Sequence, residues 1–266
     1  AEQPIVCRFA QYQLVSNQWR RYLGDLSDRR FGLPLEPYDA KFAVSTVNIE
    51  ENGDVINGIT PYITPPDVIR DRDVTSVVER KLNEQSMQMC VTDLRDKDAR
   101  AVFRNYNLDF LSYTNLQLFV HAQSDNIADN ETSIFVRLGT DFADNYYEIE
   151  IPLKLTPKGT ADENGIWPDE NMINIPFNEL VETKVLRNQA GQSVVIPFSR
   201  FWGKYRVTVN GNPDLSAVMT AMIGIRNPDQ KEWGRVDDKL PKSVCVWVNE
   251  MRIKGFNQVA GWAAIA

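Results

Sequence analysis

The chain has 266 residues, of which 43% are hydrophobic, and its 36 acidic against 29 basic residues give a net charge of -7. The two signs are interleaved, so nucleic acid is not an expected partner, because duplex binding depends on Lys and Arg neutralising phosphates. A chain of this length can bury roughly 75% of its unfolded surface in a core of normal size. The start lacks a basic stretch followed by an apolar run, and no stretch approaches the ~20 apolar residues of a membrane helix. We therefore expect neither a signal peptide nor a membrane-spanning helix in this sequence.

The N-terminal part predicts a helix followed by an extended segment. Residues 16–34 place Trp19, Tyr22, Leu23 and Leu26 at helical spacing, which indicates one amphipathic helix. The next forty residues are rich in proline, and only residues 40–49 alternate as a strand does. We therefore interpret residues 1–75 as a helical and extended arm.

From about residue 76 the pattern changes to that of an all-β domain. A helix is expected at residues 178–187, with Asn178 as its cap. Many short strands separated by turn residues indicate a mainly β fold, a jelly-roll-like sandwich, over residues 76–257 with a tail at 258–266. In fold this sandwich resembles galactose-binding and carbohydrate-binding modules. The eight predicted strands cover residues 85–92, 116–122, 132–138, 146–153, 172–176, 205–209, 217–225 and 243–256.

Residues 131–153 are the clearest element. Apolar and polar residues alternate in both arms, which predicts a β-hairpin with one face in water. Its loop, residues 139–145, is rich in Gly, Asp and Asn and carries Phe142. In the last strand, residues 243–256, the side chains of both faces are apolar in the first half, whereas only one face is apolar in the second half. This pattern is typical of a central strand that leaves the core.

Histidine-based chemistry is limited to one residue, His121. No G-x-S-x-G, H-E-x-x-H, P-loop or G-x-G-x-x-G motif occurs in the sequence. A histidine within a strand is more often a hydrogen-bonded, half-buried residue than a catalyst. We expect a protein that is not an enzyme and that uses neither a metal nor another cofactor.

Carboxylates offer two further hypotheses. Asp141, Asp144, Glu148 and Glu150 lie close together in the sequence, and paired carboxylates serve glycoside hydrolysis. Asp141, Asp144 and Asn145 could alternatively supply oxygen ligands to calcium. Glu148 and Glu150 fall on the predicted outer face of a strand, and the loop spacing matches no fixed calcium motif, so a solvated turn is the preferred interpretation.

Three cysteines, Cys7, Cys90 and Cys245, leave at least one thiol unpaired. Cys90 and Cys245 lie in β-patterned stretches, where free cysteine commonly acts as a small buried hydrophobe. We favour buried free thiols over a disulfide framework, and the pairing of the three residues is left open.

Aromatic residues in or beside loops are the candidate contact residues. Exposed rings can stack on sugars or on a protein partner, although covering the core of a sandwich is their commoner role. The candidates for partner or ligand contact are Phe142, Trp167, Trp202, Tyr205 and Trp233.

Several stretches in a fixed order resemble the SprA/Sov family of the Bacteroidetes. They include VNIEENG, LNEQSM, DARAVFRNYNLDF, LQLFVHAQ, FVRLGTDFADNYYEIEIPLKLTP, MIGIRNP and VWVNEMRIKGF followed by GWAA. The family comprises very large outer-membrane proteins associated with gliding motility and type IX secretion. None of these stretches is a catalytic signature, and their shared order carries the resemblance.

This resemblance implies one extramembrane segment, periplasmic or at the cell surface, of a giant outer-membrane translocon. The expected partners are the rest of the parent barrel, secretion-system subunits or exported proteins. The expected role is to brace or line the export path or to dock a partner. A weaker likeness to carbohydrate-binding jelly rolls supports the architecture and carries no binding residue across. The alternatives are therefore a surface carbohydrate-binding module, with a glycan as partner, and a glycoside hydrolase.

Overall fold

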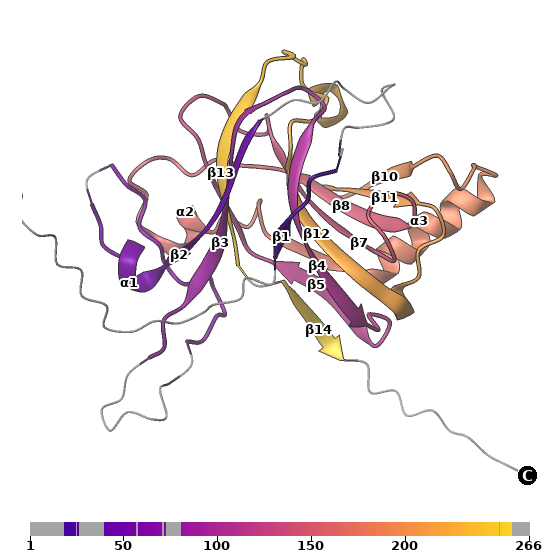
Figure 1. Cartoon of the computed structure of the whole chain (residues 1–266), viewed down its shortest axis with the longest axis horizontal. Helices are drawn as coiled ribbons and strands as arrows, with labels where there is room; N and C mark the ends of the chain where they lie inside the picture. The colour runs from indigo at the N-terminus through magenta and orange to yellow at the C-terminus, as the bar shows by residue number, and fades with distance from the viewer. Residues whose placement is uncertain are drawn as a thin grey trace, which may run out of the picture.

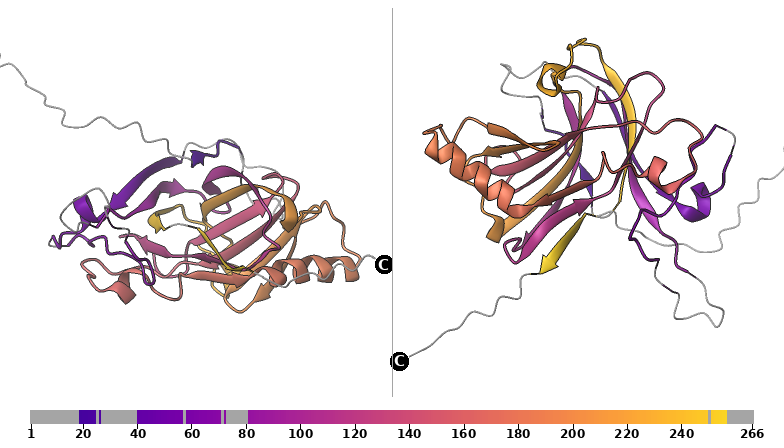
Figure 2. Two further views of the ribbon diagram at one scale, coloured as in Figure 1. Left: turned by 90° about the horizontal axis from the view of Figure 1, so that it is seen from below. Right: turned by 180° about the vertical axis from the view of Figure 1, so that it is seen from behind.

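A computed structural model describes residues 19–24, 26, 40–56, 58–70, 72, 81–249 and 251–256. Its strands form two layers that pack face to face (Figures 1 and 2). The first layer is a seven-stranded antiparallel sheet in the order β1-β4-β12-β7-β8-β11-β10. Its strands are β1 (Arg20–Arg21), β4 (Ala99–Leu108), β12 (Val218–Arg226), β7 (Ser133–Gly139), β8 (Tyr146–Pro152), β11 (Tyr205–Asn210) and β10 (Phe198–Trp202).

The second layer consists of a four-stranded sheet, β2-β3-β13-β6, and a three-stranded sheet, β14-β5-β9. Their strands are β2 (Lys41–Asn48), β3 (Gln85–Leu94), β13 (Lys242–Val248), β6 (Val120–Gln123), β14 (Arg252–Phe256), β5 (Tyr113–Leu118) and β9 (Ile173–Pro176). The chain passes from β5 to β6 at Phe119 and leaves β13 at Asn249, and the Asn249 N–H donates to the Phe119 carbonyl at 3.1 Å. Two neighbouring strands thus bend at the same level, so the two sheets are halves of one bent layer.

The core lies between the two layers, because the side chains that each layer directs toward the other are mostly aliphatic. Ile134, Val136 and Leu138 of β7 face a core that also contains Val244 and Val246 of β13, all nearly inaccessible to solvent. Burying an aliphatic side chain of this size contributes roughly 1.5–3 kcal/mol relative to exposure. This packing, repeated over many strands, holds the sandwich together.

Helices occupy little of the described chain: α1 (Ile49–Asn52), α2 (Glu163–Ile166), α3 (Phe177–Gln189) and the 3-10 turns η2 (Leu215–Ala217) and η3 (Gln230–Trp233). The longest, α3, buries Phe177 and Leu180 and lies against β10 and β11 at one end of the molecule (Figures 1 and 2). Within the described ranges, no helix has the length and apolar character needed to cross a bilayer.

The mainly β sandwich predicted from sequence is confirmed, as is a helix near residues 178–187. The helix begins one residue earlier than predicted, and its cap is Pro176 rather than Asn178. Two predicted strands, 116–122 and 243–256, are each divided between two sheets because the chain bends within them. The strands β4 and β10 were not predicted, since arginine and asparagine interrupt their apolar alternation.

The predicted N-terminal helix is wrong where the structure describes that segment. Arg20–Arg21 form the strand β1, paired with Phe103 and Val102 of β4, instead of a helical turn. An exposed edge of β4 offers backbone hydrogen bonds there, and tertiary pairing outweighs helical spacing. The strand predicted at residues 40–49 is confirmed as β2, which belongs to the four-stranded sheet.

Residues 131–153 form the predicted hairpin, with β7 and β8 paired from Ser133–Pro152 to Gly139–Tyr146. The prediction that one face is in water is wrong, because the side chains on both faces are buried along β7 and along most of β8. The face that carries charged residues is covered by other parts of the chain, and the residues on it form the first candidate site.

Candidate functional site

The outer face of the seven-stranded sheet carries five buried charged residues, named here the ionic cluster. They are Arg137, Glu148, Glu150, Arg206 and Arg226. Strand register brings them together: on β8, Glu148 is opposite Arg137 of β7, and Glu150 is opposite Arg206 of β11. In each of these strands, the residues next to the charged one point into the core. The charged side chains therefore all point to the outer face, because successive side chains of a strand alternate between its two faces.

Each glutamate of the ionic cluster is bound by two arginines. Glu148 accepts hydrogen bonds from Arg137 at 2.6 and 3.0 Å and from Arg226 at 2.9 and 3.1 Å. Glu150 accepts from Arg206, from Arg226 and from the Ser133 hydroxyl. Arg226 therefore joins the two carboxylates, and both carboxylates are engaged in hydrogen bonds.

Burial alone would raise the pKa of Glu148, but the Arg226 and Arg137 guanidinium groups beside it hold its pKa well below the usual range. The carboxylate therefore stays charged inside the protein. Isolated buried charges are costly, whereas a paired and hydrogen-bonded cluster avoids that cost.

Aromatic rings cover the ionic cluster from several directions. Arg137 lies 3.8 Å from the Tyr146 ring centre and donates to the Phe142 carbonyl, and Arg206 lies 5.9 Å from the Trp233 ring centre. Phe142 also contacts Tyr22 and Phe103 at ring-centre distances of 5.5 and 5.1 Å. The glutamate pair raised by the sequence for glycoside hydrolysis is thus enclosed and neutralised.

The loop considered for calcium is held by its own backbone. Asp141 accepts hydrogen bonds from the N–H groups of Ala143, Asp144 and Asn145 and from the Asn145 side chain. Partial burial raises the pKa of Asp141, but these hydrogen bonds outweigh it and leave the pKa below its usual value. Among the described residues, no three His, Cys, Asp or Glu side chains gather as a metal site requires.

The outer face of the four-stranded sheet carries a different group, named here the aromatic cluster: Tyr62, His121, Trp167 and Trp247. His121 of β6 stacks on Trp247 of β13 at 4.0 Å, and Tyr62 lies 5.8 Å from Trp247 and 6.1 Å from Trp167 between ring centres. The Trp167 indole N–H donates to the Ile63 carbonyl at 2.8 Å. The cluster therefore attaches the segment around Tyr62 and the turn after α2 to this sheet.

His121 is a neutral packing residue. Its Nδ1 lies 3.0 Å from the Ile166 carbonyl, which can only accept, so Nδ1 carries the proton. Burial lowers the pKa of His121 from 6.5 to about 4, and the hydrogen bonds that the Ile166 and Gln123 oxygens would accept from a charged ring oppose this only in part. The sequence pattern was typical of a half-buried, hydrogen-bonded histidine, whereas the structure buries His121 fully and uses its ring for packing and hydrogen bonding.

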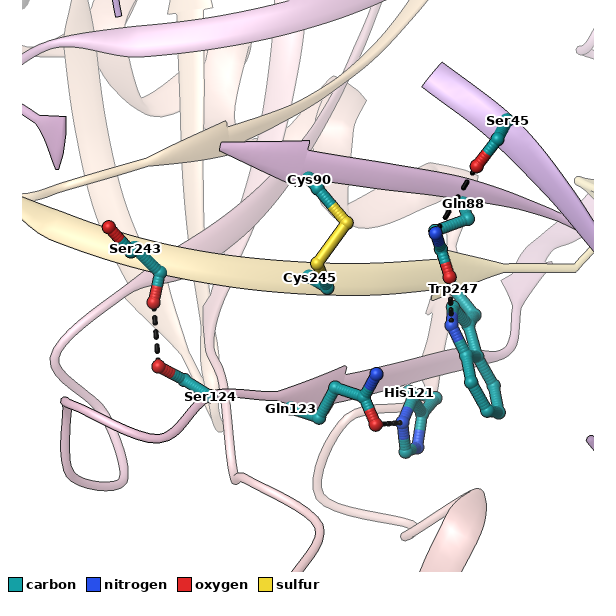
Figure 3. Close-up of a disulfide and its surroundings, with 9 residues drawn as sticks. All are labelled: Ser45, Gln88, Cys90, His121, Gln123, Ser124, Ser243, Cys245 and Trp247. Carbon is teal, nitrogen blue, oxygen red and sulfur yellow. Dashed lines mark hydrogen bonds between the residues drawn. A yellow bond between two sulfur atoms is a disulfide. The ribbon is translucent and has the colours of Figure 1, made fainter. Parts of the chain in front are cut away.

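Cys90 and Cys245 form a disulfide, which corrects the interpretation of both as free thiols (Figure 3). Both lie in neighbouring antiparallel strands, directly opposite each other, with 4.1 Å between their Cα atoms. A sequence separation of 155 hides this pairing in the sequence, because only the sheet order makes β3 and β13 neighbours. Cys7 lies outside the described residues.

A groove of about 370 Å³ lies over the disulfide. It is lined by Cys90 and Thr92 of β3, by Cys245 of β13, by residues 58–60, and by residues 123–126 with Thr156 and Lys158. The lining contains hydroxyl and amide groups but no aromatic ring. This groove is the second candidate site.

The structure does not bring the five predicted contact residues together. Trp167 and Tyr205 are only 3% and 5% exposed, so the expectation that Trp167 is exposed is wrong. Trp202 is half-buried and stacks on Tyr205 at 5.6 Å, while Phe142 and Trp233 are half-buried over the ionic cluster. Rings at the ends of a sandwich serve here mainly to cover packed surfaces.

Sequence reasoning missed the ionic cluster and the groove over the disulfide. The charged residues of β7, β8, β11 and β12 were visible in the sequence, but which of these strands are neighbours was not. The signal that could have found the cluster is the presence of residues of opposite charge on the same, outward face of several predicted strands.

Residues 2–266 of the sequence match the SprA_N family, described as motility related/secretion protein. The chain belongs to this family. The resemblance predicted from the ordered stretches is therefore confirmed. No curated protein matches the sequence significantly.

Two solved structures resemble the fold of this SprA_N chain. One is a family 11 carbohydrate-binding module from Clostridium thermocellum in complex with a beta-1,3-1,4-mixed-linked tetrasaccharide, 12% identical, with a TM-score of 0.41 over 90% of this chain and 89% of that chain. The other is the family 11 module of the cellulosomal cellulase Lic26A-Cel5E of the same organism, 10% identical, with a TM-score of 0.42 over 91% and 89%. At these values the likeness carries no argument about ligands.

Proposed function

We propose that this SprA_N chain is a non-catalytic, extramembrane domain of a large outer-membrane protein-secretion channel, of the type IX secretion and gliding-motility type, and that it braces this assembly. The single observation that carries the bracing role is that the chain's own side chains cover part of each outer sheet face. The ionic cluster is buried on one face and the aromatic cluster is buried on the other. Such a domain is rigid and offers a fixed shape to neighbouring parts.

The Cys90–Cys245 disulfide supports a location outside the cytoplasm. Disulfides persist in oxidising compartments such as the bacterial periplasm and the cell surface, and are rare where cellular thiols keep cysteines reduced. This agrees with an extramembrane segment of an outer-membrane protein. Family membership supports the association with secretion and motility.

The expected partners are the rest of the parent barrel or a fixed secretion subunit, and the alternative is an exported protein in transit. The test is site-specific photocrosslinking in cells, with the probe in the intact parent protein at Val195 or at Phe201. These side chains are 80% and 53% exposed and lie at or before β10. A matched probe at Val236, 87% exposed on another loop, serves as the control for random capture.

A bracing domain captures the same partner at Val195 and Phe201 whether or not cargo is being exported. Capture that appears only during export would instead assign the domain to the lining of the export path. Equal capture of many proteins at all three positions would contradict a specific contact on the side of β10.

A second candidate, binding of a surface glycan, is favoured by one observation, the polar groove over the disulfide. Thr92, Gln123 and Asn126 present hydrogen-bonding groups along it. Affinity electrophoresis in gels that contain soluble polysaccharides tests this candidate, with Gln123→Ala and Asn126→Ala as variants. Retardation that both variants abolish would support it, and unchanged mobility in every polysaccharide would reject it.

A further inference from the structure

The disulfide is half-buried at the bottom of an open groove, not in the core. Cys90 and Cys245 point away from the sandwich interior, since the alternate residues Val91 and Val244 enter it. Figure 3 shows the sulfur–sulfur bond lying across β3 and β13, with Gln123 and Ser243 beside it. The sulfur atoms therefore face a cavity of about 370 Å³ that a small thiol or a loop of another protein can enter.

Hydrogen bonds on both sides of the disulfide hold the same strands together without it. On one side, the Trp247 indole N–H donates to Gln88 at 2.9 Å and Gln88 donates to Ser45 at 3.2 Å, which links β13, β3 and β2. On the other side, the Asp93 N–H donates to the Ser243 hydroxyl at 3.0 Å, which links β3 to β13. The Ser124 hydroxyl donates to the Ser243 carbonyl at 2.6 Å, which links the end of β6 to β13 (Figure 3). The register of β3 and β13 therefore does not depend on the sulfur–sulfur bond alone.

The charge of the groove does not oppose a thiolate. Among its lining residues the charged groups are Asp125 and Lys158, which pair with each other at 2.8 Å on the exposed rim. The floor beside the sulfurs is neutral, with Thr92, Gln123 and Ser243 nearby. Thiol–disulfide exchange requires access to a sulfur and the approach of a negatively charged thiolate, and this groove allows both.

We propose that Cys90–Cys245 is a site of thiol–disulfide exchange in the folded domain, and that it reacts with a dithiol protein outside the cytoplasm. This inference does not depend on the bracing role. One thiolate of the dithiol attacks a sulfur of the pair, a mixed disulfide forms, and the other cysteine leaves as a thiolate that takes up a proton. The second thiolate of the dithiol then attacks the mixed disulfide, so that the dithiol is oxidised and both cysteines of this chain are reduced. The reverse sequence restores the bond, because the sheet keeps the two cysteines opposite each other.

The test measures the rate of reduction in native buffer with the dithiol dithiothreitol as the probe. The Cys7→Ser chain removes the third thiol, and samples are quenched by alkylation and counted by mass spectrometry. The expected rate rises in proportion to the dithiothreitol concentration, and circular dichroism of the reduced protein retains the β spectrum. With excess glutathione in place of dithiothreitol, a mixed disulfide on Cys90 or Cys245 is expected.

Two variants narrow the groove without touching the cysteines. Thr92→Trp places a ring on the floor beside Cys90, and Asn126→Trp places one on the exposed rim. Either is expected to slow reduction at least tenfold. Gln85→Trp, at an exposed position of the same strand outside the groove, leaves the rate unchanged.

A rate that is independent of dithiothreitol concentration and equal to the rate of global unfolding would overturn the proposal. Loss of the β spectrum on reduction would also overturn it, since the site would then be purely structural. If Thr92→Trp fails to fold, the comparison of Asn126→Trp with Gln85→Trp decides.

Discussion

The outer face of the seven-stranded sheet carries three arginines and two glutamates, whereas the outer face of the four-stranded sheet carries aromatic rings and a disulfide. The first face is enclosed by rings such as Phe142 and Trp233. The second is closed around Trp247 but open above Cys245. Buried charged residues stabilise the folded protein only when each of them has its partner. A face that is open to solvent tolerates substitutions better, and its side chains remain accessible.

The largest effect is expected where the closed face is broken. Glu148→Gln removes the charge that Arg137 and Arg226 share, and leaves buried guanidinium groups without their full partner. We expect a loss of about 3–5 kcal/mol in the free energy of unfolding, measured by urea denaturation. Glu182→Gln, on the exposed side of α3, is the control and should change the free energy by less than about 0.5 kcal/mol. A loss below about 1 kcal/mol for Glu148→Gln would mean that water reaches the ionic cluster.

The second prediction concerns the open face. Removing the disulfide with Cys90→Ala and Cys245→Ala frees a long loop in the unfolded chain, which should lower the free energy of unfolding by about 2–4 kcal/mol. The native circular dichroism spectrum should persist, because hydrogen bonds on both sides of the disulfide hold β3 to β13, from Trp247 to Gln88 and from Asp93 to Ser243. Thermal unfolding checks both statements, and an unfolded double variant would show that the face depends on the bond.

The third prediction uses pH to separate the two faces. His121 is the one histidine of the chain, and its pKa falls from 6.5 in the unfolded state to about 4 in the folded state. The unfolded chain therefore binds a proton that the folded protein does not, so stability is full above pH 6.5 and is lost as the pH falls toward 4. Between pH 7 and 5 the free energy of unfolding should fall by about 2 kcal/mol.

Urea denaturation at several pH values measures this loss in the wild type and in His121→Gln. The slope between pH 7 and 5 should disappear in the variant. The ionic cluster contributes only at lower pH, because the pKa of Glu148 is held low by its arginines and its unfolded value is near 4.5. An unchanged slope in His121→Gln would contradict the neutral, buried state of this residue.

The smallest effect is expected at the rim of the closed face. Phe142→Ala removes a half-buried ring from the group formed with Tyr22 and Phe103. Because the Phe142 ring is only half-buried, its removal takes away only part of the apolar area of a full phenylalanine side chain from the packed surface. We expect the free energy of unfolding, measured by thermal unfolding, to fall by about 1–2 kcal/mol. Phe256→Ala, at a ring 60% exposed, should cost less and serves as the matched control. Equal costs would show that Phe142 does not help to close the face.

The sequence by itself predicted the sandwich, the hairpin of β7 and β8, α3 and the family. These depend on local periodicity and on ordered stretches, which a one-dimensional pattern contains. It also predicted Cys90, Cys245, Glu148 and Glu150 as members of strands. Alternation in a strand shows which residues share a face, so this part required no knowledge of neighbours.

Only the tertiary structure decided what those faces do. Glu148 and Glu150 were expected in water, but arginines from β7, β11 and β12 and covering rings bury them. Cys90 and Cys245 were expected as free thiols, but the order β3-β13 places them opposite each other. Strand order arises from contacts between residues far apart in the chain, and a periodic pattern states the face of a residue without stating what lies against it.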